Sequence, residues 1–323
     1  MSQNLNITLG ALFESSWPAS KDRELARFVE EHGYDEIWVN GNIQGRDPFS
    51  ILSILSLETQ RLKLGTSVVN PSTRHPLTLA SSIATLDEIS NGRAMLGFGS
   101  SYAEALNLIG MEGEKPVEKC REAIEIIRSL LNGNAGEFTG SQYKLVGAKL
   151  SFKSRPDIKI LLGLGTGPNM AKLAGQSCDG AIFHELAEDL LGNVIANVQG
   201  NLSKRHVEGF RMLLNTMVSV GSTREQGIDA IRQQMGIFLT PRLGRTSTLY
   251  HLSDEDAREY IKDYRKIPDE FMRKFAICGS VDDCLERLEE LRAMGITGIV
   301  HRYPSIEGID NVQNLLMPRL KRN

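Results

Sequence analysis

Short apolar runs alternate with segments of helical periodicity along most of this chain. In the helical segments, apolar residues recur every three or four positions, which is the spacing of one helix face; such segments occupy 20–32, 48–59, 76–89 and 116–131. The apolar runs have the length of buried strands and occupy 5–12, 36–39, 62–69, 93–99, 159–165, 181–184, 212–221 and 296–300. Strand followed by helix is therefore the repeating unit.

This alternation predicts the fold class. Strands that alternate with helices over about 300 residues are typical of a (β/α)8 TIM barrel, whose functional groups lie at the carboxyl ends of the strands. A doubly wound sheet is the alternative. Against it, the glycine-rich segments at 97–102 and 163–168 do not satisfy G-x-G-x-x-G, and neither follows the first strand. We therefore expect the barrel.

Two segments interrupt the repeat. Residues 134–157 are polar and rich in glycine, which predicts a loop or short hairpin. A longer, charged segment near 236–275 is expected to be rich in helix. We interpret residues 1–323 as a single domain with these two insertions.

Composition excludes several classes of function. With 41% hydrophobic and 24% charged residues, the chain can bury a large core. A net charge of −3, a pI near 6.1 and the lack of a basic cluster argue against nucleic acid or an anionic membrane surface as partners. No run reaches the roughly 20 apolar residues of a membrane span, and the first residues do not resemble a signal peptide. The cysteines form no CxxC pair, which favours reduced thiols in the cytoplasm over a metal site.

Small and polar residues follow several of the predicted strands. Glycines and hydroxyl groups at Gly97, Gly99, Ser100 and Ser101 leave room for a flat ring and can hydrogen-bond its edge, or they serve tight barrel packing. A glycine-rich strand end with proline in the first turn of a helix offers free amides for a phosphate; here it comprises Gly165, Thr166, Gly167, Pro168 and Asn169.

Other polar residues near strand ends have less specific interpretations. His184 and His301 each end a strand, so either ring could face the cleft and titrate near neutrality. Arg74 is expected to pair with the acidic segment at Asp87 and Glu88, in a structural role.

A long stretch of the chain resembles a known family. Residues 64–99, which read LGTSVVNPSTRHPLTLASSIATLDEISNGRAMLGFG, are similar to the signature of luciferase-like flavin and deazaflavin oxidoreductases. Residues 115–133, 165–182 and 275–300 extend the resemblance over most of the chain. The pattern G-P-x-M-x-x-x-A-G-x-x-x-D-G resembles most the deazaflavin-dependent branch that includes methylenetetrahydromethanopterin reductase.

The resemblance implies an activity, a cofactor and a site. The expected protein is a bacterial luciferase-like TIM barrel that transfers a hydride between a deazaflavin, coenzyme F420, and a small organic substrate, and that forms a homodimer as many relatives do. A cis peptide bond without proline, between Ser67 and Val68, would form a bulge behind the deazaflavin ring. The candidate cofactor-binding residues are Ser67, Val68, Asn70, Gly99, Ser100, Ser101, Gly165, Thr166, Gly167, Pro168, Asn169 and His184.

The chain also departs from the family pattern. After the second strand it has Asn40 and Gly41, where many deazaflavin relatives carry Asp-His. Leu12 aligns with a glutamate of the pterin reductases, which argues against a pterin substrate, while Glu14 stands two residues further on. The candidate catalytic residues are Glu14 and Asn40. An FMN-dependent monooxygenase and a flavin-binding barrel without activity stay open as alternatives.

Overall fold

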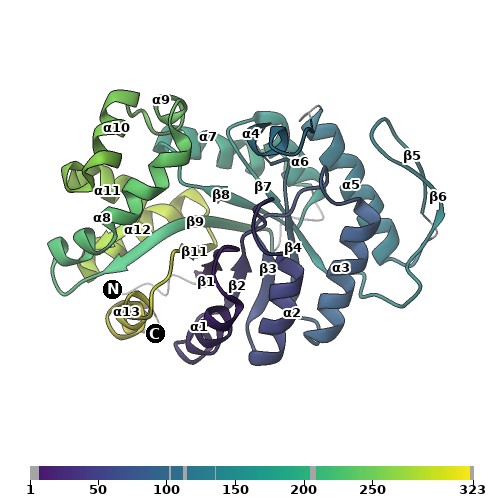
Figure 1. Ribbon diagram of the computed structural model, residues 1–323, viewed down its shortest axis with the longest axis horizontal. Coiled ribbons are helices and arrows are strands. Elements are labelled where there is room, and N and C mark those ends of the chain that lie inside the picture. The colour runs from purple at the N-terminus through teal and green to yellow at the C-terminus, as the bar shows by residue number, and fades with distance from the viewer. Residues whose placement is uncertain (1–6, 102, 112–114, 135, 204–208, 321–323) are drawn as a thin grey trace.

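The computed structural model describes residues 7–101, 103–111, 115–134, 136–203 and 209–320 and contains a closed parallel barrel (Figure 1). The order β8-β9-β11-β1-β2-β3-β4-β7 closes because β8 pairs with both β7 and β9. The expected (β/α)8 fold is confirmed. The barrel strands are β1 (Thr8–Phe13), β2 (Glu36–Val39), β3 (Lys63–Thr66), β4 (Ala94–Phe98), β7 (Lys159–Gly163), β8 (Gly180–His184), β9 (Arg211–Val220) and β11 (Gly298–Arg302).

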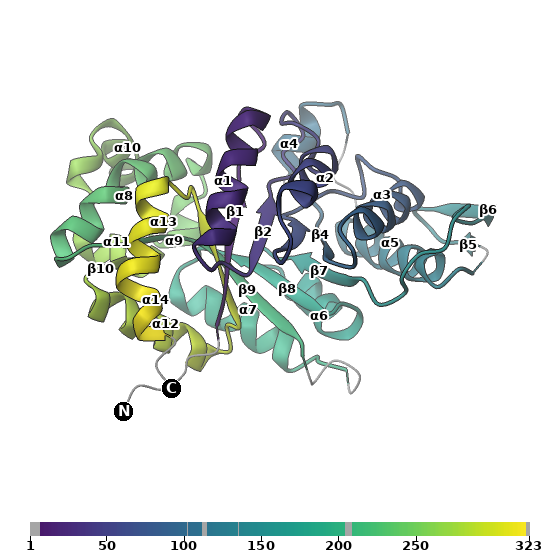
Figure 2. The same ribbon diagram turned by 90° about the horizontal axis from the view of Figure 1, so that it is seen from below.

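Helices surround the barrel on its outside (Figure 2). Several begin where a side chain caps the first turn: Asp47 accepts a hydrogen bond from Ser50 N, and Ser280 forms a capping box with Asp283. These outer helices are α1 (Ala19–Glu31), α2 (Pro48–Glu58), α3 (Pro76–Ile89), α4 (Ala103–Asn107), α5 (Pro116–Leu131), α6 (Pro168–Ser177), α7 (Glu188–Gln199), α8 (Arg224–Leu239), α12 (Val281–Met294), α13 (Ile306–Asn311), the π-helix η3 (Val312–Leu316) and α14 (Met317–Leu320). None of the helices within the described residues is long and apolar enough to span a membrane.

Side chains fill the inside of the barrel and close its amino-terminal end. The interior layer consists of Leu12, Trp38, Met95, Leu161, Ile182, Leu213 and Val300. The Trp38 indole lies against Gly65, where a Cβ would come within 2.3 Å of the ring. Below this layer, Arg211 Nη2 lies 2.5 Å from Glu36 Oε1, and Trp38 Nε1 donates to Glu36 Oε2 at 2.9 Å. The filled floor leaves the carboxyl end of the barrel for a site.

The stretch 134–157 contains an antiparallel hairpin of β5 (Gly136–Thr139) and β6 (Lys144–Ala148). The buried carboxylate of Glu122 in α5 accepts hydrogen bonds from the backbone N–H groups of Ser141, Gln142 and Tyr143 at the hairpin turn. Burial raises the pKa of Glu122, but these hydrogen bonds outweigh it, so the pKa is lowered and the carboxylate stays charged. Glu122 therefore anchors the hairpin to the barrel's outer layer.

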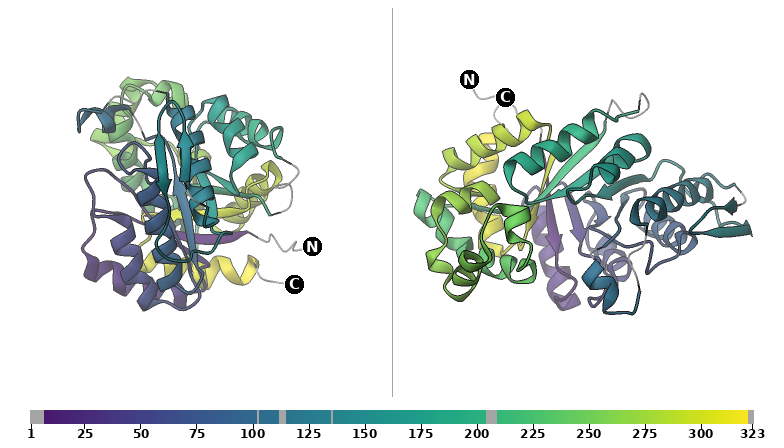
Figure 3. Two further views of the ribbon diagram at one scale, coloured as in Figure 1. Left: turned by 90° about the vertical axis from the view of Figure 1, so that its right-hand side faces the viewer. Right: turned by 90° about the horizontal axis from the view of Figure 1, so that it is seen from above.

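The stretch 236–275 begins inside α8 and continues as a helical insertion with its own apolar cluster around Met235, Phe238 and Met272. The insertion and the hairpin lie at opposite ends of the molecule (Figure 3). After the insertion, β10 (Ala276–Gly279) pairs with the outer half of β9, a strand that the sequence pattern did not predict. The insertion comprises η1 (Thr240–Arg242), α9 (Thr246–Tyr250), α10 (Asp254–Lys262), η2 (Tyr264–Lys266) and α11 (Asp269–Phe275).

Candidate active site at the carboxyl end of the barrel

Polar residues form the layer directly above the apolar interior. Side chains alternate along a strand, so a residue two positions after an interior residue faces the same way. Five strands follow this rule at the open end of the barrel, where the interior residues Leu12, Trp38, Ile182, Leu213 and Val300 are succeeded by Glu14, Asn40, His184, Asn215 and Arg302. The barrel mouth therefore gathers Glu14, Asn40 and His184, which the sequence predicted, together with Asn215 and Arg302, which it did not.

Glu14 and Asn40 contact each other across β1 and β2. Asn40 Nδ2 donates a hydrogen bond of 3.0 Å to Glu14 Oε2. The other carboxylate oxygen, Oε1, is buried without a hydrogen-bond partner among the described residues. A buried acceptor of this kind is costly unless a donor reaches it, so Glu14 is oriented by Asn40 and has one oxygen free for a ligand.

Arg302 contacts two polar groups and an aromatic ring on the adjacent side of the mouth. Its Nε lies 3.3 Å from Glu185 Oε1, and its Nη2 donates to His184 Nδ1 at 3.3 Å. The guanidinium carbon also lies 5.6 Å from the ring centroid of Phe238 in α8. Burial disfavours the charge, but Glu185 and other nearby groups outweigh it and raise the pKa of Arg302 above its usual range.

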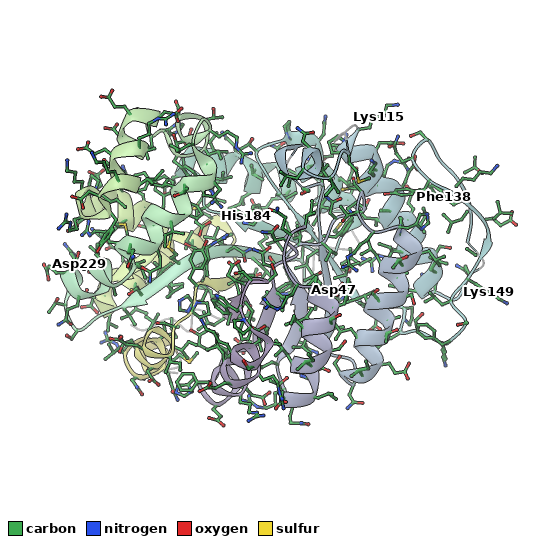
Figure 4. All side chains as sticks on the ribbon, viewed as in Figure 1. Asp47, Lys115, Phe138, Lys149, His184 and Asp229 are labelled. Atoms are coloured by element: carbon green, nitrogen blue, oxygen red, sulfur yellow. The ribbon has the colours of Figure 1, made fainter. Side chains whose placement is uncertain are left out.

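His184 is a neutral ring in this environment. Burial, followed by the positive charges of Arg302 and Arg242, lowers the pKa of His184 to about 3. The side chain is still partly exposed, as expected for a group at the open end of the barrel. Figure 4 labels His184 in the central part of the molecule, between the insertion and the hairpin.

The opposite wall of the mouth is built from backbone and small residues. The predicted cis peptide bond between Ser67 and Val68 is present. Val68 packs over glycines of two neighbouring strands, because a Cβ at Gly163 would lie 3.0 Å from Val68 Cγ1 and one at Gly99 would lie 3.3 Å from Val68 Cγ2. With no side chains at these two positions, the wall beside Val68 is smooth enough for a flat ring.

Ser67 and Asn70 fix the edges of this wall. Asn215 Nδ2 reaches across the barrel and donates to Ser67 Oγ at 3.0 Å, while Asn215 Oδ1 is buried without a partner among the described residues. Asn70 Nδ2 donates to the carbonyl oxygen of Ser100 at 3.2 Å, which ties the loop after β3 to the loop after β4. Ser101 follows with a positive φ of 65°. The wall is therefore held by hydrogen bonds from three strands.

The amino terminus of α6 lies at the same end of the barrel, directly after β7. Residues 165–169 are exposed, and Gly167 at the helix cap has no side-chain capping hydrogen bond. A Cβ at Gly165 or Gly167 would meet nothing within 4 Å. Unpaired N–H groups and the helix dipole make this segment able to hold an anion such as a phosphate.

Two expectations about charged and polar residues were wrong. Arg74 pairs with Asp47 of the loop before α2 and not with Asp87 or Glu88, since Arg155 already holds Asp87 at 2.8 Å. His301 does not face the cleft. It faces the outer layer, where Tyr34 Oη lies 2.9 Å from its Nδ1 and burial lowers its pKa to about 4. Within the described part of the chain, no cluster of His, Cys, Asp or Glu is arranged to hold a metal ion.

Comparisons with known proteins place the chain among oxidoreductases. Residues 12–298 match the luciferase-like monooxygenase family. The chain is 32% identical to 5,10-methylenetetrahydromethanopterin reductase of Archaeoglobus fulgidus over 94% of this chain and 98% of that protein. It is 29% identical to F420-dependent glucose-6-phosphate dehydrogenase of Nocardia farcinica over 92% and 93% of the two chains.

Solved structures agree on the fold. The coenzyme F420 dependent tetrahydromethanopterin reductase from Methanopyrus kandleri superposes with a TM-score of 0.87 at 23% identity, covering 98% of this chain and 99% of that chain. An F420-dependent secondary alcohol dehydrogenase in complex with an F420-acetone adduct gives 0.79 at 20% identity, with the same coverage.

Proposed function

Because the chain belongs to the luciferase-like monooxygenase family, we propose that it transfers a hydride between the deazaflavin coenzyme F420 and a small organic substrate. Relatives that share about 30% of its residues over nearly the whole chain are a methylenetetrahydromethanopterin reductase and an F420-dependent glucose-6-phosphate dehydrogenase. Their substrates differ, whereas the F420-dependent relatives share the cofactor. The cofactor is therefore the part of the function that the family supports best.

The smooth wall at Val68, Gly99 and Gly163 is the observation that carries this proposal. A fused aromatic ring needs a flat, largely apolar surface on one face and hydrogen-bonding groups at its edge. The Val68 side chain supplies the surface, and the hydroxyl of Ser67 and the amide of Asn70 lie at its borders. The residues present thus fit a deazaflavin.

The cofactor's phosphate would lie at the amino terminus of α6. It would be held by the backbone N–H groups of Gly165, Thr166, Gly167 and Asn169. Pro168 has no N–H group, but a residue at the first position of a helix has no intrahelical acceptor for one. Ser100 and Ser101 would contact the chain between ring and phosphate, since they follow β4 next to β7.

When bound, the deazaflavin would supply a ring carbon that gives or takes a hydride. The residues of the protein would bind and orient the cofactor and the substrate, and would transfer the proton. Glu14 is the group for the proton, because its Oε1 is free and Asn40 holds the other oxygen in place. Leu12 lies in the apolar interior layer, so position 14 and not position 12 brings a carboxylate to the substrate. Exclusion of water from the barrel mouth would strengthen the electrostatic interactions of Glu14 with the substrate.

An experiment can separate this reaction from oxygen chemistry. Protein loaded with reduced F420 under anaerobic conditions is mixed with aldehydes, ketones, enones and imines, and the absorbance of oxidised F420 is followed. The proposal expects reoxidation with at least one acceptor. Product formation that requires oxygen and reduced FMN would instead identify a monooxygenase, and cofactor binding without any turnover would favour a barrel without activity.

We also propose that the protein acts as a homodimer whose subunits meet at α2 and α3. The outer surface of these helices exposes Ile54, Leu57 and Ile89. Glu58 is neutralised by two arginines of α1, whereas α1 and α5 carry many exposed charges. An apolar, weakly charged face of this kind suits a twofold contact with a second copy. Leu57→Asp should give a monomer in light scattering, whereas Val146→Asp on the hairpin should not; equal masses for both variants would refute this interface.

We propose that the whole chain is one domain and that it works in the cytoplasm. The cysteines within the described residues are all free and buried, which supports a reducing compartment. The net charge of −3 supports a small molecule, and not a nucleic acid, as the partner.

A further inference from the structure

We propose that Arg302 fixes His184 as a neutral hydrogen-bond donor, and that the Nε2–H group of this ring binds the substrate oxygen on which charge builds up during hydride transfer. This inference rests on the proposed function and assigns the reacting carbon to a carbonyl or alcohol. It makes His184 a catalytic residue and Arg302 a positioning residue.

The hydrogen bond between the two side chains determines which ring nitrogen carries the proton. A guanidinium is permanently protonated and has no acceptor, so Arg302 Nη2 can only donate to His184 Nδ1, at 3.3 Å. His184 Nδ1 must then be the acceptor. In a neutral imidazole, the hydrogen is consequently on Nε2.

The surroundings of Arg302 keep it from turning away. Glu185 Oε1 and Oε2 lie 3.3 and 3.5 Å from its nitrogens. The guanidinium carbon also lies 5.6 and 5.8 Å from the ring centroids of Phe238 and Tyr303. A planar cation that is paired with a carboxylate and lies near two aromatic rings has little freedom to reorient.

The ring is also kept neutral. A second proton on Nδ1 would point at the N–H group of Arg302 and would add a positive charge near Arg242 as well. These charges act together with burial to lower the pKa of His184 to about 3. The carboxylate of Glu185 is paired with Arg302, and Asn40 donates a hydrogen bond to one oxygen of Glu14. His184 is therefore neutral throughout the physiological range and cannot act as a proton donor by titration.

The ring lies at the barrel mouth. His184 stands two residues after the interior residue Ile182 and is partly exposed, which places its side chain on the inward side of β8 above the apolar layer. Among the described residues, none accepts a hydrogen bond from Nε2. A donor with a fixed direction and no protein partner at the mouth is available to a ligand.

The chemistry uses this donor without consuming it. In the reducing direction, a hydride leaves the reduced deazaflavin and bonds to the carbonyl carbon, and the C=O π electron pair moves to oxygen. His184 Nε2–H stabilises the developing negative charge, and Glu14 or water then delivers the proton. The substrate is reduced and the deazaflavin is oxidised by two electrons; oxidation of an alcohol is the reverse. Because the imidazole is neutral, its N–H group can donate a hydrogen bond without transferring its proton to the substrate, as a protonated ring would.

Nitrogen NMR of the ring tests the first half of the proposal without cofactor. In protein with ¹⁵N-labelled histidine, His184→Gln identifies the His184 signal by its loss, and His251→Gln identifies a surface ring for comparison. We expect His184 to be the neutral Nε2–H tautomer between about pH 5 and pH 8. The variant Arg302→Met combined with Glu185→Gln should give a mixture of tautomers, whereas Glu185→Gln alone should keep Nε2–H. A His184 ring protonated on Nδ1, or one that titrates like His251, would overturn the inference.

Kinetics test the second half. A glutamine amide can place its N–H near the position of Nε2, whereas an asparagine amide places it near Nδ1. With saturating reduced F420 and a panel of benzaldehyde, acetone and cyclohexenone, His184→Asn should lower the turnover rate by about 100-fold and His184→Gln by less. Equal rates for wild type and His184→Asn, or no carbonyl reduction by wild type, would refute the role.

The two sets of results also separate this inference from the proposed function. If F420 does not bind, the proposed function fails even when the tautomer is as expected. If F420 binds and turns over but the His184 tautomer is wrong, only the inference about Arg302 and His184 fails.

Discussion

Replacing Gly163 by alanine adds one methyl group behind the wall where we place the deazaflavin ring. The new Cβ would lie 3.0 Å from Val68 Cγ1 and 3.3 Å from Val68 Cγ2, so the Val68 side chain has to move by a few tenths of an ångström. The barrel strands behind Gly163 are packed, and the open mouth is the direction in which Val68 can move. The substitution therefore pushes Val68 into the space of the ring.

The size of the effect follows from overpacking. An extra methyl group in a packed site costs about 1–3 kcal/mol. Because a ring bound against Val68 would hinder this movement of its side chain, we assign the lower end of this range to the loss of binding free energy. A loss of about 1.4 kcal/mol is a tenfold rise in Kd. We expect Gly163→Ala to weaken F420 binding by about tenfold with little change in thermal stability.

Anaerobic fluorescence titration with F420 measures this change directly. Gly192→Ala in α7 is the matched control, since its Cβ would meet Met294 Cε at an ordinary 3.9 Å. The same Kd for Gly163→Ala and wild type would show that the ring does not lie against Val68, and the site would have to be placed elsewhere in the mouth.

Three further predictions concern the carboxylate, the floor of the barrel and acid stability. Glu14→Gln keeps the hydrogen bond from Asn40 but cannot move a proton, so turnover should fall at least about 100-fold while F420 binding measured by fluorescence stays constant; full activity would exclude Glu14 from proton transfer. Glu36→Gln leaves Arg211 without its ion pair, and urea unfolding followed by tryptophan fluorescence should show that the free energy of unfolding falls by about 3 kcal/mol without any change in F420 affinity; an unchanged midpoint would be the contrary result. His301 has a pKa of about 4 in the folded protein, against a reference value of 6.5. As the pH falls from about 6.5 towards about 4, the unfolded state takes up a proton before the folded state does, so the melting temperature should drop. A melting temperature that rises over this range would show that the ring is not buried as a neutral group.

The sequence was sufficient for the repeating strands because each one is a run of apolar residues between polar turns. It was insufficient for β10, where only four residues, AICG, follow the insertion helices without a break. It was also misleading for Arg74, since the nearby acidic segment in the sequence is bound by Arg155, which comes 68 residues after Asp87. Contacts between distant residues of this kind have no local signal.

In the candidate site, too, the sequence could predict some of the residues and not others. Glu14, Asn40 and His184 could be found because each stands where an apolar strand ends. Asn215 lies within the long strand β9, so its place in the sequence does not mark it as a site residue. Its spacing of two residues from Leu213 could have indicated that its side chain faces the inside of the barrel. Arg302 ends β11 in the same way, but its importance comes from Glu185, which precedes it by 117 residues. The role of Arg302 is therefore visible only once Glu185 is seen beside it in the structure.

We place the deazaflavin in this barrel at the mouth formed by β3, β4 and β7. The most direct test is an anaerobic fluorescence titration of the purified protein with F420 and, in a separate series, with FMN. We expect tight, saturable binding of F420 and much weaker binding of FMN. Preferential binding of FMN, or binding of neither, would contradict this assignment of the cofactor.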